Sequence, residues 1–186
     1  DTLSLTGYDF EFGINTTLNV DVVEPGGIII NAKVLCNIIA KLSDEEVTVE
    51  TNGTSVSIIS GAAQYNITGI DAEDYPELPS VNSGIPVQFE QKMLHSMITQ
   101  TLFAVADNES SKPVYTGLKF ELNNNVLTLV GVDGYRLAIR KENVNYDGDE
   151  LVFIVPKKTI RELMKLIDAE SEDNISISIG KRHIVF

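Results

Sequence analysis

The stretch LTLVGVDGYRLAIRK, residues 127–141, brings Asp133, Tyr135 and Arg136 together between two runs that alternate like strands. A carboxylate on a tight turn could act as a general base if a second catalytic group stood beside it. A tyrosine and an arginine at the rim of a turn could instead anchor a partner peptide. The Asp-Gly step is also typical of an ordinary hairpin, in which the aspartate caps its own turn and Gly134 takes a positive φ. For Asp133, we favour this capping role over catalysis.

The remaining reactive side chains do not form a recognisable catalytic or metal-binding set. His95 lies in a helical pattern with no Cys, Asp or Glu three or four residues away, and His183 lies in a terminal strand. Neither histidine has metal-ligand spacing. Phosphate-binding loops, dinucleotide fingerprints, nucleophile elbows and zinc-protease motifs are absent from the sequence. We therefore expect no catalytic residue, no metal and no cofactor, although a hydrolase or transferase built around Asp133 remains an alternative.

Two further features have plain explanations. The acidic run DAEDYPELP, residues 71–79, lacks the glycine and the alternating ligands of a calcium loop, so a solvated linker is the better interpretation.

The single cysteine, Cys36, excludes a disulfide framework and favours a reducing compartment, the cytoplasm. The first residues lack the pattern of a signal peptide, and no apolar run approaches the ~18 residues that would span a bilayer.

The charge balance argues against tight binding to nucleic acid. The chain has 186 residues and a net charge of −13, whereas a phosphate backbone attracts clustered lysine and arginine. The distribution of the basic residues matters more than the total, because a few cations on one face can still attract DNA. The hydrophobic content of 43% is enough for a packed core.

The hydropathy pattern predicts an α+β protein. Strands are expected where apolar residues alternate, at 3–5, 10–14, 47–50 and 175–179. Helices are expected where apolar residues recur every three or four positions, at about 31–42, 90–104 and 157–168.

The predicted helices carry half of the basic residues. Seven of the 14 lysines and arginines fall on them: Lys33, Lys41, Lys92, Lys157, Lys158, Arg161 and Lys165. A basic helical layer on an acidic protein suits a weak grip on phosphates without reading of bases. The alternative is that any exposed helix face collects lysine and arginine.

The two halves of the chain resemble each other. Residues 3–9 match residues 127–133 at a shift of 124, and the apolar stripe of the first helix matches that of the last at a shift of 125. The pattern predicts two copies of a domain of about 125 residues. Both copies look incomplete, so we expect an excerpt with domains at 1–81 and 82–186, joined by a linker at 71–87.

The motifs together resemble one family. The opening stretch, preceded by KPVYTG at 112–117 and followed by FIVPKKTIRELMKLI at 153–167, is similar to the second domain of the bacterial sliding clamps, the beta subunit of DNA polymerase III. The similarity extends back through TLSLTGYDFEFGI and the acidic join. It implies the DNA clamp fold, truncated at both ends, with repeated domains, antiparallel sheets outside and helices on the inner face.

The resemblance also implies site residues. Half of the family's pocket for linear peptides, which lies where the second and third domains meet, would be formed here by Lys112, Tyr115, Val132, Gly134, Tyr135, Arg136 and Leu137. Lys112 replaces the usual arginine, and Tyr115 and Tyr135 are bulkier than the family's usual residues. The basic residues on the helices would face DNA, and Tyr65 and Ile67 of QYNITGI (64–70) would lie at the dimer interface.

The implied function is that of a non-enzymatic processivity factor. Its partners would be duplex DNA without sequence preference, the DNA polymerase III alpha subunit, the clamp-loader delta subunit, other DNA polymerases, mismatch-repair proteins and a second copy in a homodimeric ring. No membrane partner is expected. The alternative is a generic β-rich interaction module without a DNA function.

Overall fold

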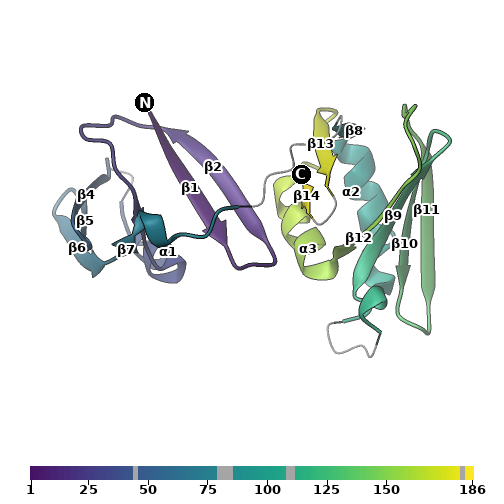
Figure 1. Cartoon of the computed structure of the whole chain (residues 1–186), viewed down its shortest axis with the longest axis horizontal. Coiled ribbons are helices and arrows are strands. Elements are labelled where there is room, and N and C mark those ends of the chain that lie inside the picture. Colours follow the sequence, from purple (N-terminus) through teal and green to yellow (C-terminus); the bar gives the residue numbers. More distant parts are fainter. Residues whose placement is uncertain (44–45, 79–85, 108–111, 181–182) are drawn as a thin grey trace. The chain divides into compact units, whose positions relative to one another are not determined.

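The computed structural model describes residues 1–43, 46–78, 86–107, 112–180 and 183–186. The chain divides into a first unit, Asp1–Leu78, and a second unit, Pro79–Phe186, and each is described by itself (Figure 1). The predicted boundary between residues 81 and 82 lies outside the described residues. No helix in the described ranges is long and apolar enough to cross a membrane.

The first unit combines short antiparallel sheets with one helix, α1 (Ala32–Ile39). Its strands are β1 (Thr2–Tyr8), β2 (Gly13–Asn19), β3 (Ile28–Ile29), β4 (Thr48–Asn52), β5 (Ser55–Ser60), β6 (Ala63–Thr68) and β7 (Ile70–Asp71), followed by the 3₁₀ turn η1 (Ala72–Asp74). β1 pairs with β2, β3 with β7, and β4, β5 and β6 form a meander. Ile38, Val56 and Ile58 form its small core.

The predicted strand at 10–14 is wrong over most of its length. Phe10 has a φ of 70°, and β2 begins only at Gly13. The Asp9 side chain accepts hydrogen bonds from the backbone N–H groups of Glu11 and Phe12, which closes a turn instead of extending a strand.

Helix α1 begins at a side-chain cap. The Asn31 side chain accepts a hydrogen bond from the Val34 N–H at 3.1 Å, which satisfies one of the free donors of the first turn. The helix ends at Ile39, earlier than the predicted residue 42. Of the predicted apolar stripe, Ile38 is buried, Leu35 and Leu42 are half-buried and Ile39 is exposed, so the stripe is only partly covered.

We expect Asn31→Ala to lower the free energy of unfolding of the first unit by about 1 kcal/mol, because the N–H of Val34 loses its partner. Urea unfolding followed by circular dichroism measures the change. Asn31→Ser, which also caps helices, serves as the control and should restore most of the loss. Equal losses in the two variants would contradict the capping role.

The second unit is larger and begins with β8 (Val87–Glu90), α2 (Gln91–Thr99) and the 3₁₀ turns η2 (Leu102–Ala104) and η3 (Pro113–Tyr115). There follow β9 (Gly117–Asn123), β10 (Val126–Val132), β11 (Leu137–Asn143), β12 (Leu151–Pro156), α3 (Lys157–Leu166), β13 (Asn174–Ile179) and β14 (Ile184–Val185). The main antiparallel sheet has the order β11-β10-β9-β12, and a smaller one has the order β14-β13-β8.

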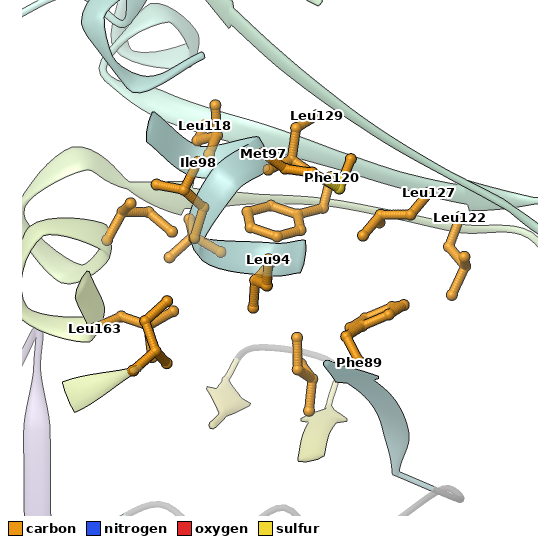
Figure 2. Packing of buried hydrophobic residues seen from close by; sticks show 14 of the residues in the cluster. Phe89, Leu94, Met97, Ile98, Leu118, Phe120, Leu122, Leu127, Leu129 and Leu163 are labelled. Atoms are coloured by element: carbon orange, nitrogen blue, oxygen red, sulfur yellow. The ribbon is translucent and has the colours of Figure 1, made fainter. Parts of the chain in front are cut away.

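The core of the second unit lies between the main sheet and helices α2 and α3. Alternate residues of β9 and β10 are buried, as the period of two requires: Leu118, Phe120, Leu122, Leu127 and Leu129. Leu94, Met97 and Ile98 of α2 meet them, and Leu163 of α3 belongs to the same cluster (Figure 2). The order of elements β10-β11-β12-α3-β13 repeats that of β1-β2-β3-α1-β4, in agreement with the predicted internal repeat.

Candidate functional site

The opening stretch forms a hairpin whose turn is held by one side chain. Val132 pairs with Leu137 across the two strands, and Gly134 has a φ of 93°. Asp133 Oδ1 accepts hydrogen bonds from the N–H groups of Tyr135 and Arg136, both at 3.0 Å. Asp133 Oδ2 accepts a further bond from Arg136 Nε at 2.7 Å. The predicted capping role of Asp133 is confirmed.

The electrostatics of this turn also favour capping over base catalysis. The hydrogen bond from the Tyr135 N–H, together with those from Arg136 and its positive charge, holds the pKa of the Asp133 carboxyl below its ordinary value. A general base that works near neutral pH needs a pKa closer to 7. Among the described residues, no group of three or more His, Cys, Asp or Glu side chains could hold a metal ion. The hydrogen bonds and the lowered pKa favour a structural role for Asp133, which is to cap the turn.

The stabilising effect of Asp133 on this turn should be lost at low pH. Because the folded-state pKa of Asp133 is depressed, its stabilising effect is present above the unfolded-state pKa and lost as the pH falls through the folded-state pKa. In an NMR titration, we expect the amide signals of Tyr135 and Arg136 to shift with an apparent midpoint below 3.8, the ordinary value. Asp133→Asn should abolish that transition. A midpoint above 3.8 would contradict the hydrogen-bonding account.

The predicted pocket residues gather around this turn, at one end of the main sheet. Val132 ends β10, Leu137 begins β11, and Gly134, Tyr135 and Arg136 form the turn between them. Tyr135 and Leu137 are exposed, whereas Val132 is half-buried.

The other two predicted pocket residues belong to the η3 segment, which the fold brings to the same turn. A Cβ added to Gly134 would lie 3.9 Å from Tyr115 Cε2, so the tyrosine ring stands beside the turn. Lys112 Nζ lies 5.4 Å from the centroid of the Tyr115 ring, within range of a cation–π contact. The structure thus places the members of the predicted set next to one another, while their role in binding stays a prediction.

One neighbour of this cluster was not predicted. Phe103 of η2 is 57% exposed, and Arg136 Cζ lies 5.8 Å from its ring centroid. The pattern at 90–104 had predicted one continuous helix, but α2 ends at Thr99 and the next residues turn towards β10. The sequence contained one signal for this close approach, Gly131, since a glycine inside a strand often marks a place where another backbone segment packs closely. A Cβ there would lie 2.3 Å from Thr101 O.

Most of the predicted DNA-facing residues are exposed on their helices. Lys33 lies on α1 and Lys41 just beyond its end, both in the first unit. In the second unit, the exposed residues are Lys92 on α2 and Lys158, Arg161 and Lys165 on α3. Lys165 forms an ion pair with Glu162 at 2.7 Å. Exposure is what contact with DNA requires, but it does not test that contact.

Lys157 differs from this group. Only 8% of it is exposed, and its Nζ donates hydrogen bonds to Val105 O at 2.6 Å and to Asp107 Oδ1 at 2.9 Å. The expectation that Lys157 belongs to the DNA-facing basic residues does not agree with this burial. The physical reason lies in the helical period, because Lys157 precedes Ile160 by three positions and so shares its buried face.

The predicted interface residues Tyr65 and Ile67 lie on β6, an edge strand of the β4-β5-β6 sheet as described here. Both are half-buried and pack against the core of the first unit, between exposed neighbours on the strand. Ordinary strand alternation explains their side chains. An interface at β6 would use the free backbone edge, and it stays a prediction.

Comparison with known proteins supplies the family. Residues 1–79 match the family model of the DNA polymerase III beta subunit, N-terminal domain, and residues 88–186 match that of its central domain. The beta sliding clamp of Halalkalibacterium halodurans is 35% identical over 99% of this chain and 51% of its own length. That of Bacillus subtilis is 30% identical over 100% of this chain and 51% of its own length.

Solved structures agree. The DNA polymerase III subunit beta of Pseudomonas aeruginosa has a TM-score of 0.90 and 28% identity, over 98% of this chain and 50% of that one. The sliding clamp of Bacillus subtilis has a TM-score of 0.89 and 28% identity, over 97% and 50%. The chain spans about half the length of the curated relatives it matches. It belongs to the DNA polymerase III beta subunit family, and it has the fold of about half of a bacterial sliding clamp.

Proposed function

We propose that the chain acts as part of a processivity clamp, which encircles duplex DNA and tethers the replicative polymerase to it. One observation carries this proposal: the two units match two consecutive domains of the sliding clamps in the same order. The domains would be residues 1–81 and 82–186. The role is that of a non-catalytic accessory subunit in the cytoplasm, working as a homodimeric ring closed through β6, with Tyr65 and Ile67 beside that edge.

The proposed contact with DNA is weak and general. A ring holds DNA by topology, so strong phosphate contacts would only slow sliding. Lys92, Lys158, Arg161 and Lys165 are exposed on the two helices of the second unit, while the chain as a whole carries a net charge of −13. Screened attraction to these cations would centre the duplex, and the acidic remainder would repel stray DNA. Lys33 and Lys41 would do the same on the first unit.

The proposed peptide site lies at the tip of the β10–β11 hairpin. Leu137 and Val132 offer apolar surface to a leucine or phenylalanine of the partner, and the Tyr115 ring stands beside Gly134. The guanidinium of Arg136 is held by Asp133, which leaves its remaining N–H groups to bind carbonyl or carboxylate oxygens. Tyr135 and Lys112 would frame the rim. The partners would be the DNA polymerase III alpha subunit, the clamp-loader delta subunit, other polymerases and mismatch-repair proteins.

Fluorescence polarisation with a labelled peptide of the Gln-x-x-Leu-Phe kind tests this site. We expect saturable binding to the full-length protein, weaker binding to this chain, which would supply half of the pocket, and loss of binding when alanines replace the leucine and phenylalanine of the peptide. A generic β-rich interaction module would make no distinction between the two peptides. Equal binding of both, or binding of neither, would contradict the proposed docking function.

A further inference from the structure

Lys157 carries a buried charge that the proposed function does not use. It is the first residue of α3, and its ammonium group lies between Val105 O and the Asp107 carboxylate. Burial of an ammonium group is costly unless its donors are satisfied. Asp107 is 81% exposed at its side chain, so the pair stands where the core meets solvent. The hydrogen bond from Lys157 and its positive charge lower the pKa of the Asp107 carboxyl, so the ionised form of Asp107 is stabilised.

The same residue joins two segments at the sheet end where the hairpin tip lies. The backbone N–H of Lys157 donates to Thr116 O at 3.0 Å, and the N–H of Ala106 donates to Tyr115 O at 2.9 Å. Residues 102–107 and 113–117 are therefore bonded to each other and to the start of α3. The second of these segments carries Tyr115, a predicted wall of the peptide site.

The segment held by Lys157 also lies directly behind strand β10. A Cβ added to Gly131 would come within 2.3 Å of Thr101 O and 3.1 Å of Val105 Cγ2, which leaves no free space between them. Phe103, on the same segment, lies against the guanidinium of Arg136. A shift of residues 101–107 would therefore change the positions of Val132, the residue after Gly131 on β10, and of Arg136.

We propose that Lys157 is a positioning residue for the peptide site at the hairpin tip. It acts through Val105 and Tyr115, whose segments it fixes behind and beside that tip, and this role rests on the proposed docking function. An apolar side chain of similar length would fill the same space and could stabilise the core equally well. It would leave Val105 O without the ammonium donor and release the 102–107 segment. The buried charge of Lys157 is thus explained by its placement of residues 102–107 rather than by a contribution to core stability.

Peptide affinity of three variants tests this role. In the polarisation assay, we expect Lys157→Met to raise the Kd about tenfold, since two charge-assisted hydrogen bonds are lost. Asp107→Ala, at an exposed position, removes one of the two and should raise the Kd about twofold to threefold. Lys119→Met is the matched control, because Lys119 pairs with Glu121 on the same unit and is bonded to neither segment. Its Kd should equal that of the wild type.

Amide hydrogen exchange separates positioning from general stability. In Lys157→Met, we expect the Ala106 amide to exchange at least about tenfold faster, while Leu129 of central strand β10 changes only with global stability. Lys157→Arg, which keeps the charge and its donors, should recover part of the affinity.

The outcomes separate the two proposals. If the wild type does not bind the peptide, the docking function fails. If the wild type binds it and folded Lys157→Met binds equally well, the positioning role alone is overturned. If Lys157→Met does not fold, Asp107→Ala decides, and an unchanged Kd with unchanged Ala106 exchange overturns the role.

Discussion

Phe120→Ala is expected to lower the free energy of unfolding of the second unit by about 3–5 kcal/mol. Phe120 is completely buried on β9, and its ring stacks on Phe153 with centroids 5.0 Å apart. It belongs to the cluster that joins the main sheet to α2 and α3 (Figure 2). Because domains of this size are stable by only about 5–15 kcal/mol, such a loss would leave the second unit marginally folded. Urea unfolding followed by circular dichroism measures it.

Phe103→Ala provides the matched aromatic control. Phe103 is 57% exposed, so removal of its ring opens little cavity and should cost less than about 1 kcal/mol of unfolding free energy. A similar loss in the two variants would mean that Phe120 is not the centre of the core.

Leu137→Ala is expected to weaken binding of the Gln-x-x-Leu-Phe peptide by about thirtyfold or more, the usual effect of truncating an interface hot spot. Leu137 is 61% exposed at the start of β11, directly opposite Val132. Its side chain can therefore contact a ligand without supporting the core. The unfolding free energy should change by less than about 0.5 kcal/mol. Polarisation and urea unfolding together measure both effects.

Ile139→Ala provides the matched control for this site. Ile139 lies two residues further along β11, on the same face, and is 54% exposed. Its truncation should leave the peptide Kd within about twofold of the wild type. Equal losses at the two positions would show that the peptide binds to the open face of the sheet rather than to the hairpin tip. Arg136→Ala in the full-length protein should also weaken binding without disturbing the proposed dimerisation. Loss of the dimer in that variant would contradict the placement of the pocket.

The strongest hydropathy patterns in the sequence were enough to predict the core elements. The alternation of Leu127 and Leu129 with polar or smaller residues places β10, and the period of Ile160 and Leu163 places α3. These side chains are buried because the period of each element puts them on one face. The Asp-Gly step also predicted its own turn, since the capping bonds are local to four residues.

Features decided by distant contacts could not be predicted in this way. Helix α2 ends at Thr99 without a glycine or proline to mark the end, and Thr101 O then packs against Gly131 of strand β10. The helical period places Lys157 on the buried face of α3, but the partners that compensate its buried charge, Val105 O and Asp107, lie about 50 residues earlier and could not be predicted. The wrong strand at 10–14 has a local cause instead, since the Asp9 side chain closes a turn with Glu11 and Phe12.

The candidate site was found by resemblance more than by pattern. Alternation alone would have assigned Val132 and Leu137 to one face of a sheet, with no reason to select them as a binding surface. The fold adds what the motifs could not supply, namely that Tyr115 stands beside Gly134 and that Phe103 contacts Arg136. Those neighbours come from the separate 3₁₀ turns η3 and η2.

Strand β10 serves the core and the hairpin tip at once. Its alternate residues Leu127 and Leu129 are buried, while Val132 at its end lies beside the exposed turn, which Asp133 ties down with three hydrogen bonds. A ligand at this tip meets a surface whose backbone is already ordered before the encounter. Little conformational entropy is then lost on association, so even a short peptide with two anchoring side chains can be held by a small area of contact.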